Sequence, residues 1–489
     1  MGVEWVGTSD NGFPTYFYQT EIQIEMEVVM NGQYISLDEN FTMKHSVSKS
    51  TLYCLKNGAI YELQPDQADL LQLLDGTITD EQVMAQYSDE SKPEVVQFFK
   101  QMREISALRF TTTPEPKRLQ LNRVPDRRLE SVHLEASGKC NMRCVHCYQA
   151  KYVESGAALS HIEILHLLDD LQDMQVNNVG ISGGEPLMMP RLAEVLEAIE
   201  ERDMRISALF SNGLLINKKF IEMAKDLRSR FLMFISLDSI PGVGVTFRGI
   251  RKANAQRILE RILVNIKLLV SNGIGVVVNT VVNAENIEHL DEMYRLISKL
   301  GINSWRLGFP KPTPKFKNQA DKFSVDWRSI AEHYLALLRK HLEHEMPFRL
   351  QIEYLFREEL FEQGDLQTLS NQDFVCDYEE RRSGCCVKPN GDVVSCPYCS
   401  DLPIGNIHEA SIRDIWYSDQ MNSIKMIQIG DVVECRGCGL AELCGTGCRA
   451  NAYFLHGDFH NAKDDHACLA VAFFKERVLP LLREHGMVS

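Results

Sequence analysis

Apolar and polar positions alternate with a short period near the start of the chain. The stretch "STLYCLKNGAIYELQ", residues 50–64, predicts two strands around a turn at Asn57-Gly58. Apolar residues at helical spacing follow in "PDQADLLQLLDG", which predicts a helix that ends at an Asp-Gly pair. Strands followed by helices within residues 31–115 predict a small winged-helix-like domain of their own.

Two further helices complete this domain. Thr79 and Gln82 stand in the spacing of a capping box, which predicts a helix start in "TITDEQVMAQY". The next helix is predicted from Pro93 onward, with apolar residues on one face. Residues 116–130 are rich in proline and charge and predict a linker, and residues 1–30, which carry no clear pattern, are taken as an N-terminal extension.

From residue 131 the pattern changes to strands that alternate with helices. Six apolar stretches with five helical segments between them predict parallel pairing in a partial (β/α)6 barrel, so the fold class is α/β. The predicted strands are "SVHLEAS", "NVGISGG", "ISALFSNG", "FLMFISLDS", "GIGVVVNTVVN" and "SWRLGF". Polar motifs fall at the carboxyl ends of these strands, where barrels gather their functional groups. A helix over about 325–362 is predicted next.

Composition narrows the class of protein. The chain has 489 residues and an ordinary apolar content of 44%. Its net charge of −15 disfavours nucleic acid as a partner. The N-terminal residues lack the basic and apolar regions of a signal peptide, and no apolar run is long enough to span a bilayer. We therefore expect a cytoplasmic protein without a membrane partner.

Fourteen cysteines are the strongest chemical signal. Three lie in "GKCNMRCVHCYQ" and ten lie between Cys376 and Cys468. A reducing compartment and short spacings favour metal binding over a disulfide framework. The remaining cysteine, Cys54, is expected to be a core residue of the N-terminal domain.

Cys140, Cys144 and Cys147 form a C-x3-C-x2-C array on the loop after the first barrel strand. Three thiolates leave one iron of a 4Fe-4S cluster without a protein ligand, and an open coordination position is a reaction site. A zinc site that borrows a fourth ligand, for instance His146, is the alternative.

Together with "GGEP" after the second strand, this array resembles the radical S-adenosylmethionine (SAM) superfamily. The resemblance implies that SAM chelates the open iron and is cleaved to a 5′-deoxyadenosyl radical. It also implies SAM contacts at the strand ends, where Ser211-Asn212 matches "TNG", Ser236 and Asp238 match "SLDG", and Arg248 lies in "FRG". The implied SAM-binding residues are Gly183, Gly184, Glu185, Pro186, Ser211, Asn212, Ser236, Asp238, Arg248 and Asn279.

The C-terminal cysteines resemble the SPASM domain, which binds two auxiliary 4Fe-4S clusters. The resemblance rests on the pattern C-x2-C-x5-C-x3-C that begins at Cys435 and is followed by Cys468. Cys376 and the sequence Gly391-x4-Cys396 precede it. The resemblance implies an outer cluster on Cys435, Cys438, Cys444 and Cys468 and an inner cluster on Cys376, Cys396 and Cys448. A pair of zinc ribbons is the alternative.

Cys385, Cys386 and Cys399 are surplus to this seven-cysteine pattern. One of them could complete the inner cluster, or that cluster could keep an open iron for a substrate thiolate. The sequence leaves both possibilities open.

The N-terminal domain resembles the PqqD-like recognition element of enzymes that modify ribosomally made peptides (RiPPs). The resemblance implies that a leader peptide adds as a strand beside about Ala59–Leu63 and packs against the helix Pro93–Ala107. The alternatives are a winged-helix DNA binder, which the acidic side chains disfavour, and a purely structural cap.

These resemblances imply a radical SAM/SPASM peptide maturase that forms thioether (Cys sulfur to carbon) crosslinks. Carbon–carbon crosslinking and oxidation of the sulfatase-maturase type are the alternatives, and a zinc-bearing peptide scaffold is the non-enzyme alternative. The expected cofactors are three 4Fe-4S clusters and SAM. The expected partners are a precursor peptide and an electron donor of the flavodoxin or ferredoxin type. The expected domains are 1–30, 31–115, 116–130, a radical SAM core at 131–310, a helical bridge at 311–369 and a SPASM domain at 370–489.

Overall fold

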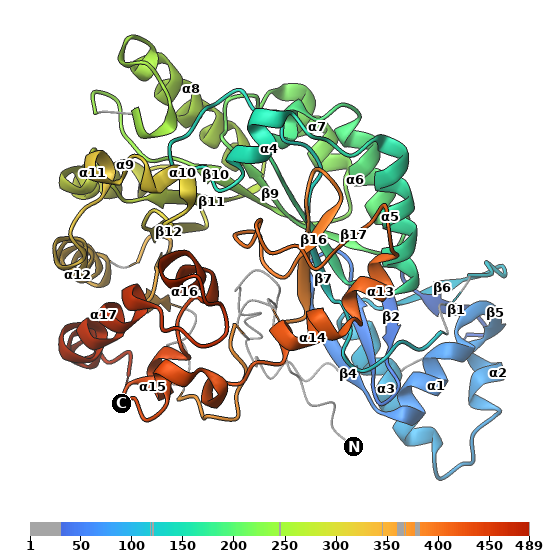
Figure 1. Ribbon diagram of the computed structural model, residues 1–489. Helices are drawn as coiled ribbons and strands as arrows, with labels where there is room; N and C mark the ends of the chain where they lie inside the picture. Colours follow the sequence, from blue (N-terminus) through green and yellow to red (C-terminus); the bar gives the residue numbers. More distant parts are fainter. Residues whose placement is uncertain are drawn as a thin grey trace.

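The computed structural model describes residues 31–488, apart from 118, 120, 121, 244, 245, 345, 359–365, 367 and 377–381. The predicted extension, residues 1–30, lies outside the described residues. Figure 1 shows the N-terminal domain in blue, the central sheet with its helices from cyan to yellow, and the cysteine-rich part in orange and red.

An eleven-stranded sheet forms the centre of the protein, in the order β14-β13-β12-β11-β10-β9-β8-β7-β15-β16-β17. Strands β7 to β13 stand in chain order and pair in parallel. Their bounds are Ser131–Glu135 (β7), Asn178–Ser182 (β8), Arg205–Ser211 (β9), Leu232–Ser236 (β10), Gly275–Val281 (β11), Ser304–Gly308 (β12) and Arg349–Ile352 (β13). The six predicted strands are thus confirmed, each within a few residues of its expected bounds.

Helices connect these strands and bury their apolar sides against the sheet (Figure 1). Their bounds are Ala150–Ser155 (α4), His161–Asp173 (α5), Leu192–Glu201 (α6), Lys218–Asp226 (α7), Lys252–Ser271 (α8) and Leu290–Ile297 (α9). In α6, for example, Val195, Leu196 and Ile199 are fully buried, and each such side chain contributes about 1.5–3 kcal/mol of burial free energy. Since every connection returns to the same end of the sheet, the polar strand ends meet at one edge.

The helix predicted over 325–362 is wrong in its second half. Helix α12 spans Trp327–Glu343, and the chain then forms β13 and the short strand β14, Phe356–Arg357. Pro347 cannot continue a helix because it lacks the backbone N–H and clashes with the preceding turn. After it, Leu350 and Ile352 alternate with polar residues and are buried, which is the pattern of a strand.

A strand from the cysteine-rich part joins the sheet beside β7, which the sequence did not predict. Strand β15, Gly384–Val387, pairs in parallel with β7 and is followed by β16, Asp392–Val394, and β17, Gly405–Asn406. Next to this pairing the Lys388 Nζ lies 2.7 Å from a carboxylate oxygen of Glu135, and both side chains are fully buried. Removing one partner of such a pair is strongly destabilising, so this pair holds the two parts together.

The N-terminal domain contains two three-stranded sheets, in the orders β5-β1-β6 and β2-β3-β4. The strands are Tyr34–Leu37 (β1), Phe41–His45 (β2), Ser50–Cys54 (β3), Ile60–Leu63 (β4), Asp75–Thr79 (β5) and Leu108–Thr111 (β6). The helices are Pro65–Leu73 (α1), Asp80–Met84 (α2) and Lys92–Glu104 (α3). Cys54 is 6% exposed and belongs to this domain's apolar core, as predicted.

Two local predictions in this domain are confirmed and one is wrong. Gly58 has a φ of 83°, as the Asn-Gly turn requires. The capping box is present, because Gln82 N donates to the Thr79 side chain and Thr79 N donates to Gln82. The helix predicted to reach Gly76 ends at Leu73 instead, and the β-branched residues that follow pair with β1.

The segment predicted as a linker is partly packed against the rest of the protein. Leu129 is fully buried, and Val124 forms a parallel bridge with Ser46. The Arg127 guanidinium donates to the Trp416 carbonyl at 2.6 Å. These contacts connect the segment to the N-terminal domain, to the core of the central sheet and to the cysteine-rich part.

The cysteine-rich part consists of short helices around its loops. Their bounds are Ile412–Trp416 (α13), Asp419–Lys425 (α14), Ala441–Cys444 (α15), Arg449–His456 (α16), Asp465–Phe473 (α17) and Leu479–Glu484 (α18), while Pro314–Lys317 (α10) and Ala320–Phe323 (α11) precede α12. Within the described part of the chain, no helix combines the length and the apolar character that a membrane crossing needs.

Candidate functional site

The three cysteines predicted to bind a cluster lie on the loop between β7 and α4, and all three are half-buried free thiols. Burial raises the pKa of Cys140, and it raises the pKa of Cys147 to about 11. Such thiols become thiolates when they bind a metal, since the positive ion replaces the proton.

Two glycines bring the turn after β8 onto this loop. Gly184 N donates to the Ser137 carbonyl at 2.7 Å, and Glu185 N donates to the Lys139 carbonyl at 2.8 Å. A Cβ on Gly184 would lie 2.2 Å from the Lys139 oxygen, and one on Gly183 would lie 2.5 Å from the Ser137 oxygen. Only glycine permits this approach, which explains the "GGEP" pair in physical terms.

Replacing Gly184 by alanine is expected to displace the cysteine loop. The added methyl group overlaps the backbone of Lys139, and overpacking of this kind costs about 1–3 kcal/mol. We expect reconstituted Gly184→Ala protein to lose the iron of one cluster, about four per chain, in a colorimetric iron assay. Gly439→Ala is the control, because a Cβ there meets open space. Full iron content in Gly184→Ala would contradict the prediction.

Glu185 accepts hydrogen bonds from polar groups at the end of β9. Its carboxylate accepts hydrogen bonds from the Ser211 hydroxyl and from Asn212 N, each at 2.8 Å. The Asn212 amide in turn donates to Asn141, which lies between the first two cysteines, at 2.7 Å. Glu185 is 1% exposed, and burial raises its pKa. Glu185, Ser211 and Asn212 are therefore brought together beside the cysteine loop, with Pro186 buried next to them.

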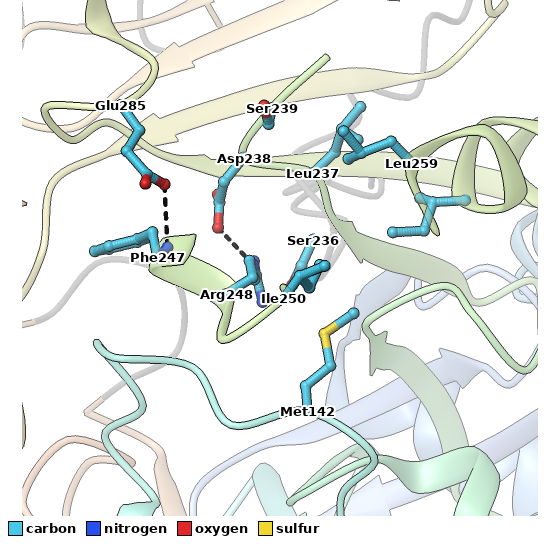
Figure 2. A pocket seen from close by; sticks show the side chains of 11 residues that line it. Met142, Ser236, Leu237, Asp238, Ser239, Phe247, Arg248, Ile250, Leu259 and Glu285 are labelled. Atoms are coloured by element: carbon cyan, nitrogen blue, oxygen red, sulfur yellow. Dashed lines mark hydrogen bonds and ion pairs between the residues drawn. The ribbon is translucent and has the colours of Figure 1, made fainter. Parts of the chain in front are cut away.

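A second group of predicted residues lines a pocket beside the same loop (Figure 2). The Arg248 guanidinium pairs with Asp238, and its Nη1 donates to the Cys144 sulfur at 3.7 Å. Burial lowers the pKa of Arg248, but Asp238 and Cys144 outweigh it and hold this pKa above its ordinary value. The lining residues are Met142, Ser236, Leu237, Asp238, Ser239, Phe247, Arg248, Ile250, Leu259, Ile262 and Glu285.

The "FRG" turn is docked on the cysteine loop by another glycine. A Cβ on Gly249 would lie 2.4 Å from the Arg143 oxygen, and Val145 N donates to the Phe247 carbonyl at 2.9 Å. His146 stacks on Phe247, with ring centroids 4.0 Å apart. Asn279, the last predicted SAM contact, pairs with Ser236 across β10 and β11 and is half-buried.

Sequence reasoning missed Glu285 and Met142. Glu285 accepts from Phe247 N at 3.1 Å and from the Thr246 hydroxyl, and so holds the turn that carries Arg248 (Figure 2). Glu285 could have been predicted from its position after β11, in "NAEN", because polar residues at the strand ends of this sheet belong to the site.

The C-terminal cysteines form two groups. Cys435, Cys438, Cys444 and Cys468 are electrostatic neighbours, and burial together with the other three thiols raises the pKa of Cys444 to about 12. Cys376, Cys396 and Cys448 pack in an apolar cluster that Cys435 also contacts. Among the residues that the structure describes, no three or more His, Cys, Asp or Glu side chains lie close enough to hold a single metal ion.

Known protein families match both the central part and the cysteine-rich part of this chain. Residues 134–297 match the radical SAM superfamily, and residues 376–439 match SPASM, an iron–sulfur cluster-binding domain. The AdoMet-dependent heme synthase of Methanosarcina barkeri is 27% identical over 345 residues, which cover 66% of this chain and 92% of that protein. AlbA of Bacillus subtilis, an antilisterial bacteriocin subtilosin biosynthesis protein, is 25% identical over 309 residues, covering 60% of this chain and 61% of that protein.

The fold is also that of a solved structure. SuiB of Streptococcus suis, bound to its precursor peptide SuiA, superposes with a TM-score of 0.63 at 18% identity, over 88% of this chain and 99% of that chain. The chain therefore carries a radical SAM domain at residues 134–297, followed by a SPASM domain at residues 376–439. These two domains imply 4Fe-4S clusters and SAM as cofactors.

The residues of the cysteine loop fit such a cofactor. Three thiols share one loop, two glycine contacts fix that loop, and the Arg248 cation lies against the Cys144 sulfur. A positive charge at this place favours thiolate ligands and a negatively charged cluster.

Proposed function

We propose that this protein is a radical SAM enzyme and installs thioether crosslinks in a ribosomally made precursor peptide whose leader segment binds to the N-terminal domain. The observation that carries the proposal is the position of β4 at the end of the β2-β3-β4 sheet. Among the described residues, no strand pairs with its outer edge, which is the geometry that strand addition needs.

The register of this sheet tells which backbone groups would receive the leader. Cys54 N donates to the Ala59 carbonyl at 2.8 Å, so that pair is hydrogen-bonded, and the pairs alternate along the hairpin. Leu52–Tyr61 is then hydrogen-bonded as well, which turns the N–H and C=O groups of Ile60 and Glu62 to the outer edge. Helix α3, whose buried residues are Val95, Phe98, Phe99 and Met102, belongs to the same core.

Cys140, Cys144 and Cys147 would hold the cluster that binds SAM. Bound there and reduced by one electron, SAM supplies a 5′-deoxyadenosyl radical. The Glu185 carboxylate accepts from Ser211, Asn212 and Leu187 N, and its remaining lone pair would accept the SAM ammonium group. Arg248 has further N–H groups besides those on Asp238 and Cys144, and a guanidinium suits the SAM carboxylate.

Three 4Fe-4S clusters are proposed, one on the cysteine loop and two in the SPASM domain. The crosslink would join a substrate sulfur to carbon. The 5′-deoxyadenosyl radical would take the carbon-bound hydrogen and leave as 5′-deoxyadenosine, with methionine as the other product of SAM. The thiol proton would pass to a base, and the inner auxiliary cluster would accept the surplus electron. A flavodoxin or ferredoxin-type donor would supply the initial electron. The domain bounds that we propose are the ones expected from the sequence.

The test is incubation of the reconstituted enzyme with SAM, reductant and the cognate precursor, followed by mass spectrometry. The expected product is lighter by two hydrogen atoms per crosslink and has lost one alkylatable thiol per crosslink. The same mass loss with unchanged thiols would replace the thioether assignment by carbon–carbon crosslinking. A thiol or hydroxyl converted without any crosslink would favour oxidation of the sulfatase-maturase type.

A further inference from the structure

Five cysteines pack in the apolar cluster of the cysteine-rich part, among them Cys435 of the expected outer set. Cys399 is 1% exposed and packs in this cluster with Cys376, Cys396 and Cys448. The apolar residues around them include Val375, Ile427, Ile429 and Val432, which come from different segments of the chain. The cluster thus gathers these thiols from three separate loops. Cys399 and Cys448 are buried, and Cys376 and Cys396 are half-buried.

The local backbone places Cys399 beside Cys396. Cys399 N donates to the Cys396 carbonyl at 2.9 Å, which closes a tight turn over Pro397 and Tyr398. The two thiols also hydrogen-bond each other. The electrostatic neighbours of Cys399 are the other three thiols of the group, Cys396, Cys448 and Cys376. A C-x2-C turn of this kind is a common element of metal sites.

The other surplus cysteines belong elsewhere. Cys385 and Cys386 are successive residues of β15, so their side chains point to opposite faces of the sheet. Cys385 packs in the large core of the central sheet, and Cys386 lies against the buried pair of Glu135 and Lys388. Neither belongs to the apolar cluster that contains Cys376, Cys396, Cys399 and Cys448.

Buried positive charge accompanies the four thiols. Lys311 pairs with Glu353 and is an electrostatic neighbour of Cys448, and it lies 5.7 Å from the ring centroid of Tyr398. Lys425 is 7% exposed and donates to the Ser395 carbonyl at 2.8 Å. Its electrostatic neighbours are Cys385 first and then Cys396, Cys376 and Cys399. Burying an ammonium group is costly unless negative charge lies near it. A cluster held by four thiolates carries a net negative charge and would supply it.

We propose that Cys399 is the fourth protein ligand of the inner auxiliary cluster, with Cys376, Cys396 and Cys448. The inner cluster then has no open iron, and a substrate thiolate is held outside its coordination sphere. The inner cluster in this arrangement accepts an electron without binding the peptide. This inference rests on the proposed function only for the role of the cluster, since the ligand set is independent of the peptide reaction.

The test measures the cluster itself, without SAM or peptide. The parent is protein in which Cys140, Cys144 and Cys147 are alanine, so that its iron, about eight per chain, reports the auxiliary clusters alone. Adding Cys399→Ala is expected to lower iron to about four per chain, or to convert one cluster to a three-iron form with its own electron paramagnetic resonance signal. Cys385→Ala and Cys386→Ala are the matched controls and should keep all the iron.

Parental iron and an unchanged resonance spectrum in Cys399→Ala would overturn the proposal, as would loss of one cluster in Cys385→Ala or Cys386→Ala instead. Circular dichroism and the signal of the outer cluster show whether the variant is folded. Cys399→Ser gives a second measurement, because a serine oxygen can replace the thiolate with an altered reduction potential, whereas a non-ligand position would leave the potential unchanged. Failure of the thioether assay with a normal Cys399 result would reject the proposed function and keep the ligand assignment.

Discussion

Replacement of Cys140, Cys144 and Cys147 by alanine is expected to abolish reductive SAM cleavage and to leave the auxiliary clusters in place. The three thiols lie on one loop between β7 and α4, and none of them belongs to the thiol groups of the SPASM domain. Without them the only open coordination position for SAM is lost. In a dithionite assay, 5′-deoxyadenosine should fall to background, while iron falls from about twelve to about eight per chain.

Cys54→Ala is the matched control for this result. Cys54 is a buried cysteine of the N-terminal core, far along the chain from every proposed ligand, and its loss removes only part of an apolar contact. This variant should keep its iron and its SAM cleavage. Formation of 5′-deoxyadenosine by the triple variant would reject the assignment of the SAM-binding cluster to this loop.

The second large effect is expected at the outer edge of β4. Glu62→Pro removes an N–H group that faces away from β3, so the hairpin keeps its own hydrogen bonds, and proline is tolerated on edge strands. A lost backbone hydrogen bond to a buried partner costs about 1–3 kcal/mol, so the dissociation constant for the leader peptide should rise about fivefold or more. Fluorescence anisotropy with a labelled leader peptide measures it.

Glu62→Ala separates the backbone effect from that of the side chain. Glu62 pairs with Lys49 on the surface, and an exposed pair of this kind contributes at most about 1 kcal/mol. The alanine variant keeps the N–H group and should bind the leader almost as the parent does. Equal binding by the proline variant would show that the leader does not add to this edge. SAM cleavage without peptide should be the same in all three proteins.

Strand and helix positions in the radical SAM core followed from the sequence because local and tertiary signals agree there. The buried parallel strands are continuous apolar runs, as β8 shows, and Ser160 begins α5 with a side chain that accepts from Glu163 N. The "GGEP" and "FRG" turns were also predicted as parts of the site. What the sequence could not show is the reason for their glycines, the close backbone approach to Ser137, Lys139 and Arg143.

Contacts between distant segments account for what was missed. A short apolar run such as β15 pairs with whichever strand edge is near, and only the assembled sheet shows that this edge belongs to β7. The same holds for the choice among Cys385, Cys386 and Cys399. Their spacing to Gly391 is equally compatible with a ligand role, whereas their faces and neighbours in the folded chain differ.

The pairing of β7 with β15 has a consequence for how electrons cross the protein. The loop after β7 carries Cys147 and Tyr148, and the turn after β16 carries Cys396 and Tyr398. Two hydrogen-bonded ladders, β7–β15 and β15–β16, therefore connect the two cysteine-bearing regions. The rings of Tyr148 and Tyr398 meet between these regions, with centroids 4.9 Å apart. If the proposed ligand sets hold their clusters, the sheet would therefore set the distance for electron transfer between them.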